Sequence, residues 1–164
     1  MGFDYLPEVI PVERYPDVLA LNEAALPHVN SLSLGDLTTL ADQAFYFRMI
    51  AVDGAVAGFM LALTPGQDYQ SLNYRWFSQS YDSFVYVDRI VVDPGFAGRG
   101  IGQRLYQDLT TATRGVAPRI TCEVNLSPPN PRSLAFHQRL GFDEVGQQPT
   151  EDGHKQVSLL CKPV

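Results

Sequence analysis

The sequence predicts an α/β or α+β domain built around one mixed sheet, and three observations support this fold class. Strand and helix patterns alternate along the chain in the order strand, helix, helix, hairpin, strand, helix, strand, helix, strand, strand. The segment 84–92 is apolar on both faces, as a strand inside a sheet is. A glycine-rich turn then leads into an amphipathic helix. With 164 residues and 45% apolar content, the chain fits a single domain, 1–164.

The first part of the chain predicts a short strand, two helices and a hairpin. Ser33 caps the second helix, with Asp36 three residues later, the pattern of a capping box. Asp53-Gly54 is the strongest short signal for a two-residue hairpin turn. The expected elements are a strand at 8–12, helices at 16–25 and 33–44, and strands at 45–52 and 55–63.

The segment 64–83 has no convincing periodicity, and we expect a long loop there. Its five aromatic residues make disorder unfavourable. Packing over the core is the commoner explanation for such rings. The alternative is that they line a substrate pocket, which needs apolar walls with a few polar groups. Three of them are candidates for substrate binding: Tyr74, Trp76 and Tyr81.

The glycines after strand 84–92 lie where the strand meets the next helix, a geometry that suits an anion. Glycine lets a backbone approach a ligand, and the first free N–H groups of a helix point outward at the positive end of its dipole. A P-loop would need Lys and Ser/Thr where the chain has Ile101 and Gly102. The dinucleotide pattern would need glycine at Gln103. The glycines have a simpler alternative role, which is tight packing.

The last third predicts one helix, a strand, a short helix and a closing pair of strands. The short helix has Asn130 as cap, Pro131 as first residue and Gly141 as terminator. The expected ranges are 101–115 and 130–140 for the helices, and 119–125, 142–146 and 156–161 for the strands.

The composition limits the kinds of ligand and partner that the protein is expected to bind. The formal net charge is −6 and the pI about 4.9, and Lys and Arg are scattered singly, so nothing resembles a basic stripe for nucleic acid. An acidic protein more naturally attracts cationic amines. His and Cys fall at unrelated spacings, so we expect no metal. Cys122 and Cys161 fit free thiols in a reducing compartment.

No targeting or membrane segment is expected. The N-terminus carries Asp4 and Glu8, unlike a signal peptide. The longest apolar run, 55–63, is shorter than the about 20 residues that a membrane helix needs. A cytoplasmic protein is the default expectation, as a monomer or homodimer.

Two motifs in the right order resemble those of the GCN5-related N-acetyltransferase (GNAT) superfamily. Its coenzyme A loop, [QR]-x-x-G-x-[GA], is matched from Ala97 to Gly102, with alanine in place of Gln or Arg. Its second motif, N-x-x-[AS]-x-x-[FL]-Y-x-x-x-G-F, is matched from Asn130 to Phe142, with His137 in place of tyrosine. The resemblance implies a mixed, mostly antiparallel sheet of about seven strands with a splayed parallel central pair, flanked by about four helices.

The resemblance implies acetyl-CoA as cofactor and a set of residues that contact it. The superfamily polarises the acetyl carbonyl with a backbone N–H, here around 90–92. Arg104 and Arg132 are further candidates for phosphate contacts, with surface solvation as the alternative. The implied cofactor-binding residues are Ile90, Val91, Val92, Ala97, Gly98, Arg99, Gly100, Ile101, Gly102, Gln103, Asn125, Asn130, Ser133, Phe136 and His137.

Acetylation needs an amine with a free lone pair, but an alkylammonium group has a pKa of about 10.4 and is almost fully protonated at neutral pH. A base that removes the proton therefore assists the reaction. Asp88 is our first candidate, since it lies in the apolar strand that leads to the loop. An ion pair is an equally weighted alternative for Asp88. Glu123, on the polar face of the next strand, is the second candidate.

His137 occupies the position of the superfamily's tyrosine, which often acts as general acid. The alternative is a core histidine bonded to a backbone carbonyl. A thiol is a tolerable leaving group because its pKa is about 8.5, so we expect the acid to matter less than the base.

The leading hypothesis is an N-acetyltransferase that acts by direct transfer in a ternary complex on a small amine, amino acid or peptide amine. Two alternatives remain. One is a domain that binds acyl-CoA as a sensor without catalysis, and the other is a transferase for a different acyl group.

Overall fold

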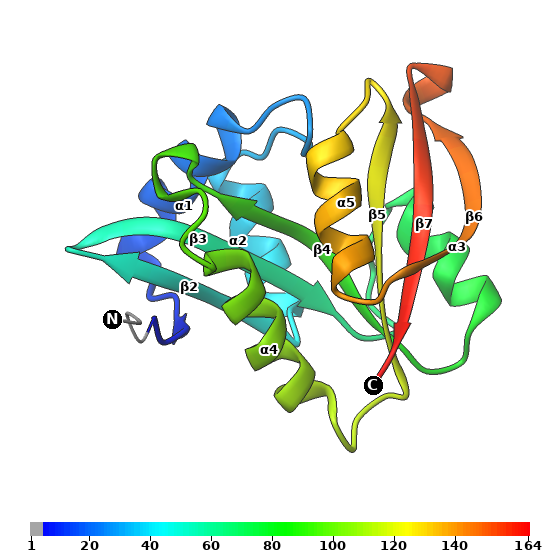
Figure 1. The fold of residues 1–164 in the computed structure, drawn as a ribbon, viewed down its shortest axis with the longest axis horizontal. Helices are drawn as coiled ribbons and strands as arrows, with labels where there is room; N and C mark the ends of the chain where they lie inside the picture. The colour runs from blue at the N-terminus through cyan, green and yellow to red at the C-terminus, as the bar shows by residue number, and fades with distance from the viewer. Residues whose placement is uncertain (1–4) are drawn as a thin grey trace. The chain divides into compact units, whose positions relative to one another are not determined.

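The computed structural model describes residues 5–164, and its elements follow the predicted order with one additional helix (Figure 1). Asp4, which entered the expectation about targeting, lies outside the described residues. The strands are β1 Glu8–Val9, β2 Tyr46–Val52, β3 Ala55–Leu63, β4 Val85–Val92, β5 Arg119–Ser127, β6 Asp143–Thr150 and β7 Lys155–Pro163. The helices are α1 Tyr15–Ala24, α2 Leu34–Gln43, α3 Leu72–Ser80, α4 Ile101–Thr113 and α5 Pro131–Arg139, with 3-10 turns at Val12–Arg14, Pro94–Phe96 and Glu151–Gly153.

Seven strands form one mixed sheet in the order β1-β2-β3-β4-β5-β7-β6. β4 and β5 are parallel, with Val85 opposite Ile120 and Tyr86 opposite Thr121. The pairs β1–β2, β2–β3, β5–β7 and β6–β7 are antiparallel. The predicted fold class is therefore confirmed.

The backbone divides into two compact units that share strand β4. The first unit comprises the chain up to Leu63 and the segment Asp88–Ala112, and the second comprises Thr64–Val87 and Thr113–Val164. The end of β4 from Asp88 thus belongs to the first unit and its beginning to the second.

The first unit contains the β2–β3 hairpin and three helices. Asp53 and Gly54 both have positive φ, 51° and 82°, which a two-residue hairpin turn requires, so the predicted turn is confirmed. The predicted capping box of α2 is also present: the Asp36 N–H donates to Ser33 Oγ, and the Ser33 N–H to Asp36 Oδ2, each at 3.0 Å. Figure 1 shows α1 and α2 on one face of the hairpin and α4 on the other.

The second unit corrects one prediction, because the segment expected to be a loop contains helix α3. Ser71 caps it by accepting a hydrogen bond from the Tyr74 N–H at 3.2 Å. Tyr74 and Phe77, three residues apart, form its buried ridge, with 3% and 0% of their surface exposed. Such a short ridge in a Ser-, Asn- and Gln-rich segment gives little helical periodicity, which is why the pattern did not predict it.

Some strand boundaries also differ from the prediction. β1 has only two residues, Glu8–Val9, because Pro11 leads directly into the 3-10 turn Val12–Arg14. β6 and β7 extend beyond the predicted ends to Thr150 and Pro163. Their mutual hydrogen bonds hold polar residues in strand conformation that composition alone does not favour.

Candidate functional site

The turn after β4 is shaped by Asp93. Its N–H donates to the Ala57 carbonyl of β3 at 2.8 Å, which ends the strand. Its side chain accepts a hydrogen bond from the Gly95 N–H at 2.9 Å and caps the 3-10 turn Pro94–Phe96. The chain therefore leaves the sheet in a fixed direction at the start of the glycine loop, which we define as residues 97–103.

The glycine loop has the backbone geometry that an anion site needs. Gly98 and Gly100 have φ of 78° and 76°, a region that other residues rarely adopt. A Cβ at either position would meet nothing within 4 Å, so the space beside the backbone is open. The first helical bond of α4 joins the Arg104 N–H to the Gly100 carbonyl at 3.0 Å, and residues 101–104 include no acidic side chain to compete with an anion.

The glycine loop is anchored by the buried first turn of α4. Ile101 is 2% exposed and anchors the first turn of α4, while Ala97, Gly98, Arg99, Gly100 and Gln103 are exposed. Gly58 of β3 allows this packing, because a Cβ there would lie 2.8 Å from Ile101 Cγ2 and 3.0 Å from the Val91 carbonyl oxygen. Gly58 was not among the predicted site residues, although a lone glycine inside an apolar strand does indicate a close approach of another backbone or side chain.

Asp88, the first candidate base, lies in an ion pair. Arg89 Nε donates to Asp88 Oδ2 at 2.8 Å, and both side chains are only 4% exposed. Arg89 Nη1 also donates to Asn22 Oδ1 at 2.8 Å and to the Asn30 carbonyl at 3.0 Å. The structure thus shows the alternative that the sequence left open for Asp88, and it adds Asn22 to the polar groups beside β4.

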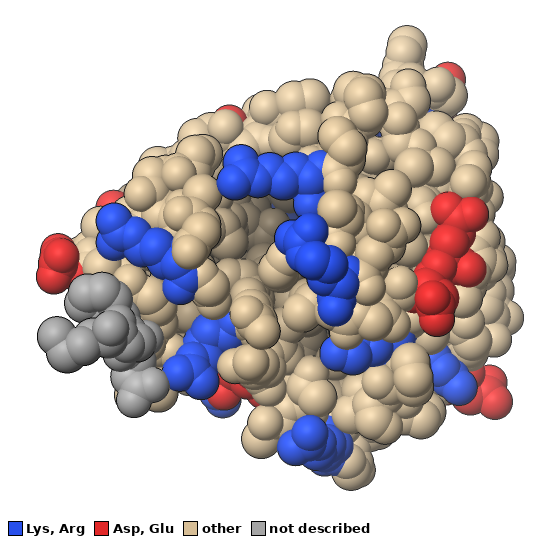
Figure 2. Space-filling model, viewed as in Figure 1, with Lys and Arg blue, Asp and Glu red and all other residues tan. Residues whose placement is uncertain are grey.

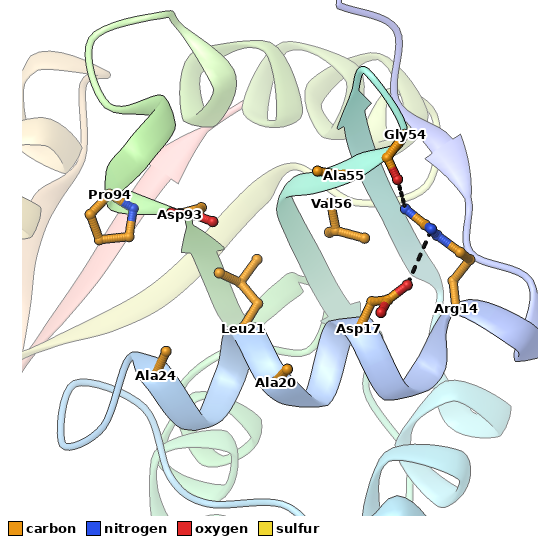
Figure 3. A pocket seen from close by; sticks show the side chains of 10 residues that line it. All are labelled: Arg14, Asp17, Ala20, Leu21, Ala24, Gly54, Ala55, Val56, Asp93 and Pro94. Carbon is orange, nitrogen blue, oxygen red and sulfur yellow. Dashed lines mark hydrogen bonds and ion pairs between the residues drawn. The ribbon is translucent and has the colours of Figure 1, made fainter.

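The first unit also contains a pocket of about 420 Å³, within the size range of small-ligand sites. Arg14 closes one end by donating to the Gly54 carbonyl at 2.7 Å and pairing with Asp17 at 3.1 Å (Figure 3). This pocket could not be predicted from the sequence, because its walls come from three separate segments. They are Arg14, Asp17, Ala20, Leu21, Ala24, Gly54, Ala55, Val56, Asp93 and Pro94.

In the second unit, Glu123 lies on β5 beside a buried tyrosine of β4. The Tyr86 hydroxyl donates to Glu123 Oε1 at 2.9 Å, and Tyr86 itself is fully buried. Asn125, two residues further along β5, is 8% exposed, and its carbonyl accepts a hydrogen bond from the Asn130 N–H at 3.1 Å. This bond closes the turn between β5 and α5.

Helix α5 contains most of the second motif, Asn130 to Phe142. The Asn130 side chain caps the helix by accepting from the Ser133 N–H at 3.4 Å. His137 is 2% exposed and packs edge-on against Phe136 and Phe142, with ring centroids 5.2 and 5.4 Å apart. Its Nδ1 lies 2.8 Å from the Ser133 carbonyl oxygen and 3.4 Å from Ser133 Oγ.

The Ser133 carbonyl determines the tautomer of His137. A carbonyl oxygen only accepts, so Nδ1 carries the hydrogen and Nε2 of the neutral ring has a lone pair. Burial lowers the pKa of His137 below its usual 6.5, and the bond to Ser133 offsets part of this effect. This environment is the one that the core-histidine alternative described.

The three aromatic substrate candidates differ in their surroundings. Tyr74 is a core residue: its hydroxyl donates to the Thr64 carbonyl at 2.6 Å and accepts from the Gln67 N–H at 3.0 Å. Trp76 is half-buried and packs so closely on β6 that a Cβ at Gly146 would lie 2.7 Å from its Cζ2 atom. The Tyr81 ring lies 4.2 Å below the guanidinium of Arg119. Packing thus accounts for their positions, and a substrate contact stays a prediction for Trp76 and Tyr81.

Charge on the surface is unevenly distributed. Figure 2 shows Lys and Arg side chains more prominently than Asp and Glu on the face that carries α4, although the chain has a formal net charge of −6. Arg99 stacks over Phe96 at 5.1 Å, while Arg132 is exposed in the first turn of α5. Local positive charge of this kind can hold a polyanion on an acidic protein.

The described residues contain neither a metal-binding cluster nor a membrane-spanning helix. Across 5–164, no group of three or more His, Cys, Asp or Glu side chains is arranged to hold a metal ion. Over the same range, none of the helices combines the length and apolar character needed to cross a bilayer.

Comparison with known proteins gives matches in both sequence and fold. The profile of the acetyltransferase (GNAT) family matches residues 15–142. A [ribosomal protein bS18]-alanine N-acetyltransferase of Salmonella typhimurium is 32% identical over 81 residues, which are 46% of this chain and 53% of that protein. A peptidyl-lysine N-acetyltransferase of the same organism is 31% identical over 75 residues, 46% of this chain and 48% of the relative. The chain thus spans about half the length of the curated relatives it matches.

The fold also matches a solved structure over nearly its whole length. Ard1 from Thermoplasma volcanium superposes with a TM-score of 0.80 at 14% identity, covering 99% of each chain. At this identity the likeness concerns the fold alone.

Proposed function

Because the chain belongs to the acetyltransferase (GNAT) family, we propose that it transfers the acetyl group of acetyl-CoA to a primary amine by direct attack in a ternary complex. The observation that carries the proposal is the glycine loop: two glycines with positive φ, open space beside them, and directly after them the N-terminus of α4, whose first N–H groups have no carbonyl partner within the helix. This geometry fits a diphosphate.

Acetyl-CoA supplies a thioester whose carbonyl carbon is open to attack by an amine. The residues of the glycine loop bind its diphosphate through main-chain N–H groups, and Arg99 adds positive charge nearby. Backbone N–H groups of Ile90–Val92 polarise the carbonyl, as the family resemblance implies. Asn125, Asn130, Ser133 and Phe136 remain candidates for contacts to the rest of the cofactor.

Glu123 is the better of the two candidate bases. The Asp88 carboxylate is paired with the Arg89 guanidinium at 2.8 Å and its side chain is only 4% exposed, so one of its oxygens is already occupied and little of the group is open to a substrate. The Glu123 carboxylate accepts a hydrogen bond from the neutral Tyr86 hydroxyl at 2.9 Å, which orients the carboxylate for proton removal. We therefore assign proton removal from the amine to Glu123 and a structural role to Asp88.

His137 does not supply the proton for the leaving thiolate. Its Nδ1 hydrogen is used by the Ser133 carbonyl, and its lowered pKa keeps the ring neutral near pH 7. A thiolate with a pKa of about 8.5 leaves without full protonation, so the reaction does not depend on this acid.

A peptide or protein amine is the substrate class best supported. The two sequence relatives are named as acting on a ribosomal-protein alanine and on peptidyl lysine. The net charge of −6 is compatible with a cationic ammonium substrate.

Two synthetic peptides test this function directly. One has a free N-terminal alanine, and the other has a blocked N-terminus and one internal lysine. We expect purified protein to release free thiol from acetyl-CoA with at least one of them, and mass spectrometry to find one acetyl group on the peptide. Calorimetry that detects no CoA binding at millimolar concentration would refute the proposal.

A second candidate function follows from His137. A histidine without a transferable proton, together with Ala97 in the loop, also fits a sensor that binds acyl-CoA without catalysis. The same assay separates the two functions, because a sensor binds CoA tightly but releases no thiol with either peptide, free alanine or free lysine. Thiol release from succinyl-CoA but not from acetyl-CoA would instead indicate a different acyl group.

A further inference from the structure

The pocket of the first unit contains none of the residues that we assign to the cofactor or to the reacting amine. We call it the α1 pocket, because α1 and the residue before it form one of its walls. Its volume of about 420 Å³ is sufficient for a small molecule. The reaction proposed above makes no use of this pocket, so its lining indicates a ligand of its own.

The α1 pocket has charged groups at both ends and an apolar floor between them. Figure 3 shows Asp93 at one end and the Arg14–Asp17 pair at the other. Leu21 and Val56 lie between these ends and are 9% and 8% exposed, so the floor is part of the core. The other lining residues are small or apolar. A ligand that fits this lining has an apolar body and at least one polar group.

The charges of the lining determine the sign of that polar group. The lining includes one guanidinium and two carboxylates, so it carries an excess of negative charge. The guanidinium of Arg14 is paired with Asp17 at 3.1 Å and donates to the Gly54 carbonyl at 2.7 Å. The excess charge is therefore that of Asp93. Its Oδ1 accepts the Gly95 N–H at 2.9 Å, and the carboxylate has a second oxygen that can accept from a cationic ligand.

Asp93 also connects the α1 pocket to the glycine loop. Its N–H donates to the Ala57 carbonyl at 2.8 Å, and its side chain caps the turn Pro94–Phe96, after which the glycine loop begins. A ligand on the Asp93 carboxylate restrains this turn, so the loop loses less conformational freedom when it binds a diphosphate. Because coupling between two sites is reciprocal, CoA would strengthen binding of the pocket ligand by the same factor.

We propose that the α1 pocket is a regulatory site for a small aliphatic amine, whose ammonium group binds Asp93 and whose carbon chain lies over Leu21 and Val56. Binding of the amine strengthens CoA binding through the turn at Asp93. An anion is repelled by the excess negative charge, and a neutral alcohol leaves this charge without a counter-ion. Occupation of the pocket is independent of the proposed function, and only the effect on CoA rests on it.

Three probes of equal chain length test the class of ligand: n-butylamine, n-butanol and butyrate, titrated at constant ionic strength without CoA. Amide chemical shifts in NMR spectra report where each probe binds. We expect butylamine to give saturable shifts at Ala20, Leu21 and Val56, with a dissociation constant on the order of 1 mM. Butanol and butyrate should bind at least about tenfold more weakly. Equal binding of butanol, or no saturable shifts at these amides, overturns the inference.

Two variants and a matched control test the assigned contacts. Asp93→Asn removes the charge but keeps an oxygen for the Gly95 N–H, and it should weaken butylamine binding about tenfold. Asp36→Asn is the control, because Asp36 also accepts a capping hydrogen bond in the same unit, from the Ser33 N–H at 3.0 Å, but does not line the pocket. It should leave the affinity within about twofold. Ala20→Leu fills the pocket from α1 with another good helix former and should abolish the shifts.

Calorimetry of CoA with and without saturating butylamine tests the coupling. We expect the amine to lower the dissociation constant of CoA about fivefold in the wild type, at the lower end of typical couplings. In Ala20→Leu the amine should have no effect, and the affinity for CoA alone should equal that of the wild type. This comparison excludes an effect of amine bound at the transfer site, to which Ala20 does not belong. An unchanged CoA affinity in the wild type, or the same strengthening in Ala20→Leu, overturns the regulatory role.

Failure of this inference and failure of the proposed function give different results. A wild type that binds CoA but shows no butylamine in the α1 pocket overturns the inference and leaves the proposed transferase intact. A wild type that binds butylamine there but binds no CoA overturns the proposed function and the regulatory coupling, while the amine site stands.

Discussion

The environment of His137 predicts a measurable dependence of stability on pH. The folded pKa is below 6.5, so between the two values the unfolded chain binds more protons than the folded chain. The contribution of His137 to stability is therefore complete above pH 6.5 and is lost as the pH falls through the folded pKa. The cause is burial, because the charged ring would lose its hydration in an aromatic environment.

Urea unfolding at about pH 7.5 and about pH 5.5 checks this linkage. We expect the wild-type free energy of unfolding to fall toward the lower pH and the His137→Phe variant to show a smaller fall, since phenylalanine has no proton to bind. Equal falls in the two proteins would show that His137 is not the linked group.

Substitutions of Glu123 and Asp88 are expected to have different effects, the first on the reaction rate and the second on stability. Glu123→Gln retains shape and can still accept the Tyr86 hydroxyl, so the melting temperature should stay close to wild type while kcat falls by about 10²-fold or more. Asp88→Asn leaves Arg89 as a buried charge without its carboxylate, which destabilises by about 3–5 kcal/mol. Thermal melts and steady-state rates on the two variants distinguish these effects.

Glu144→Gln is the matched control for this comparison. Glu144 also accepts a hydroxyl, from Ser158 at 2.5 Å, but it lies exposed on β6. Its substitution should leave kcat unchanged. A normal kcat in Glu123→Gln would remove Glu123 from the mechanism.

At the scale of elements, the glycine loop is expected to tolerate no side chain at Gly100. Alanine at a φ of 76° costs about 1–2 kcal/mol, and the chain avoids this cost by rotating the loop away from its binding geometry. We expect Gly100→Ala to weaken CoA binding by tenfold or more, as an order of magnitude for one lost phosphate contact. Isothermal titration calorimetry measures this change.

Gly115 provides the control for the backbone effect. It has a φ of 80° and nothing within 4 Å of a Cβ, as at Gly100, but it follows the C-terminal end of α4. Gly115→Ala should lower the melting temperature by a similar amount with no effect on CoA affinity. Equal losses of affinity in both variants would mean that the loop has no special role.

The elements that the sequence could predict are those whose signals are local. The Ser33–Asp36 box and the Asp53-Gly54 turn each depend on a few consecutive residues, and both predictions are confirmed. The glycine-rich turn between β4 and α4 is also present, while its role in cofactor binding stays a prediction. α3 was missed because its two ridge residues, Tyr74 and Phe77, are aromatic and give no long helical stripe. Its cap Ser71 was the one available signal.

The side-chain contacts of the candidate site depend on long-range packing and could not be predicted in the same way. Arg89 bonds Asn22 and Asn30, which are 67 and 59 residues away in the chain. Asp88 could be recognised as a polar residue in an apolar strand, but its partner is the adjacent Arg89, whose side chain the alternation along a strand would place on the opposite face. The tautomer of His137 depends on a local contact, with the Ser133 carbonyl one turn earlier in α5, but the sequence does not show which partner Nδ1 takes.

For the whole molecule, strand β4 predicts one cooperative unfolding transition. The strand is continuous from Val85 to Val92, but its beginning belongs to one compact unit and its end to the other. Because the strand is continuous, unfolding of either unit releases one half of it and should destabilise the other half. Scanning calorimetry should therefore give a calorimetric enthalpy equal to the van't Hoff enthalpy.

Ligand binding extends this prediction. CoA at about 100 times its dissociation constant adds about 2.7 kcal/mol to the stability of the folded state. For a chain of 164 residues, this raises the melting temperature by about 5–10 °C. The glycine loop lies in only one of the two units, but if the units unfold cooperatively, the single transition should shift as a whole. Two transitions, with only one of them shifted by CoA, would show that the units unfold independently and that 1–164 is not one cooperative domain.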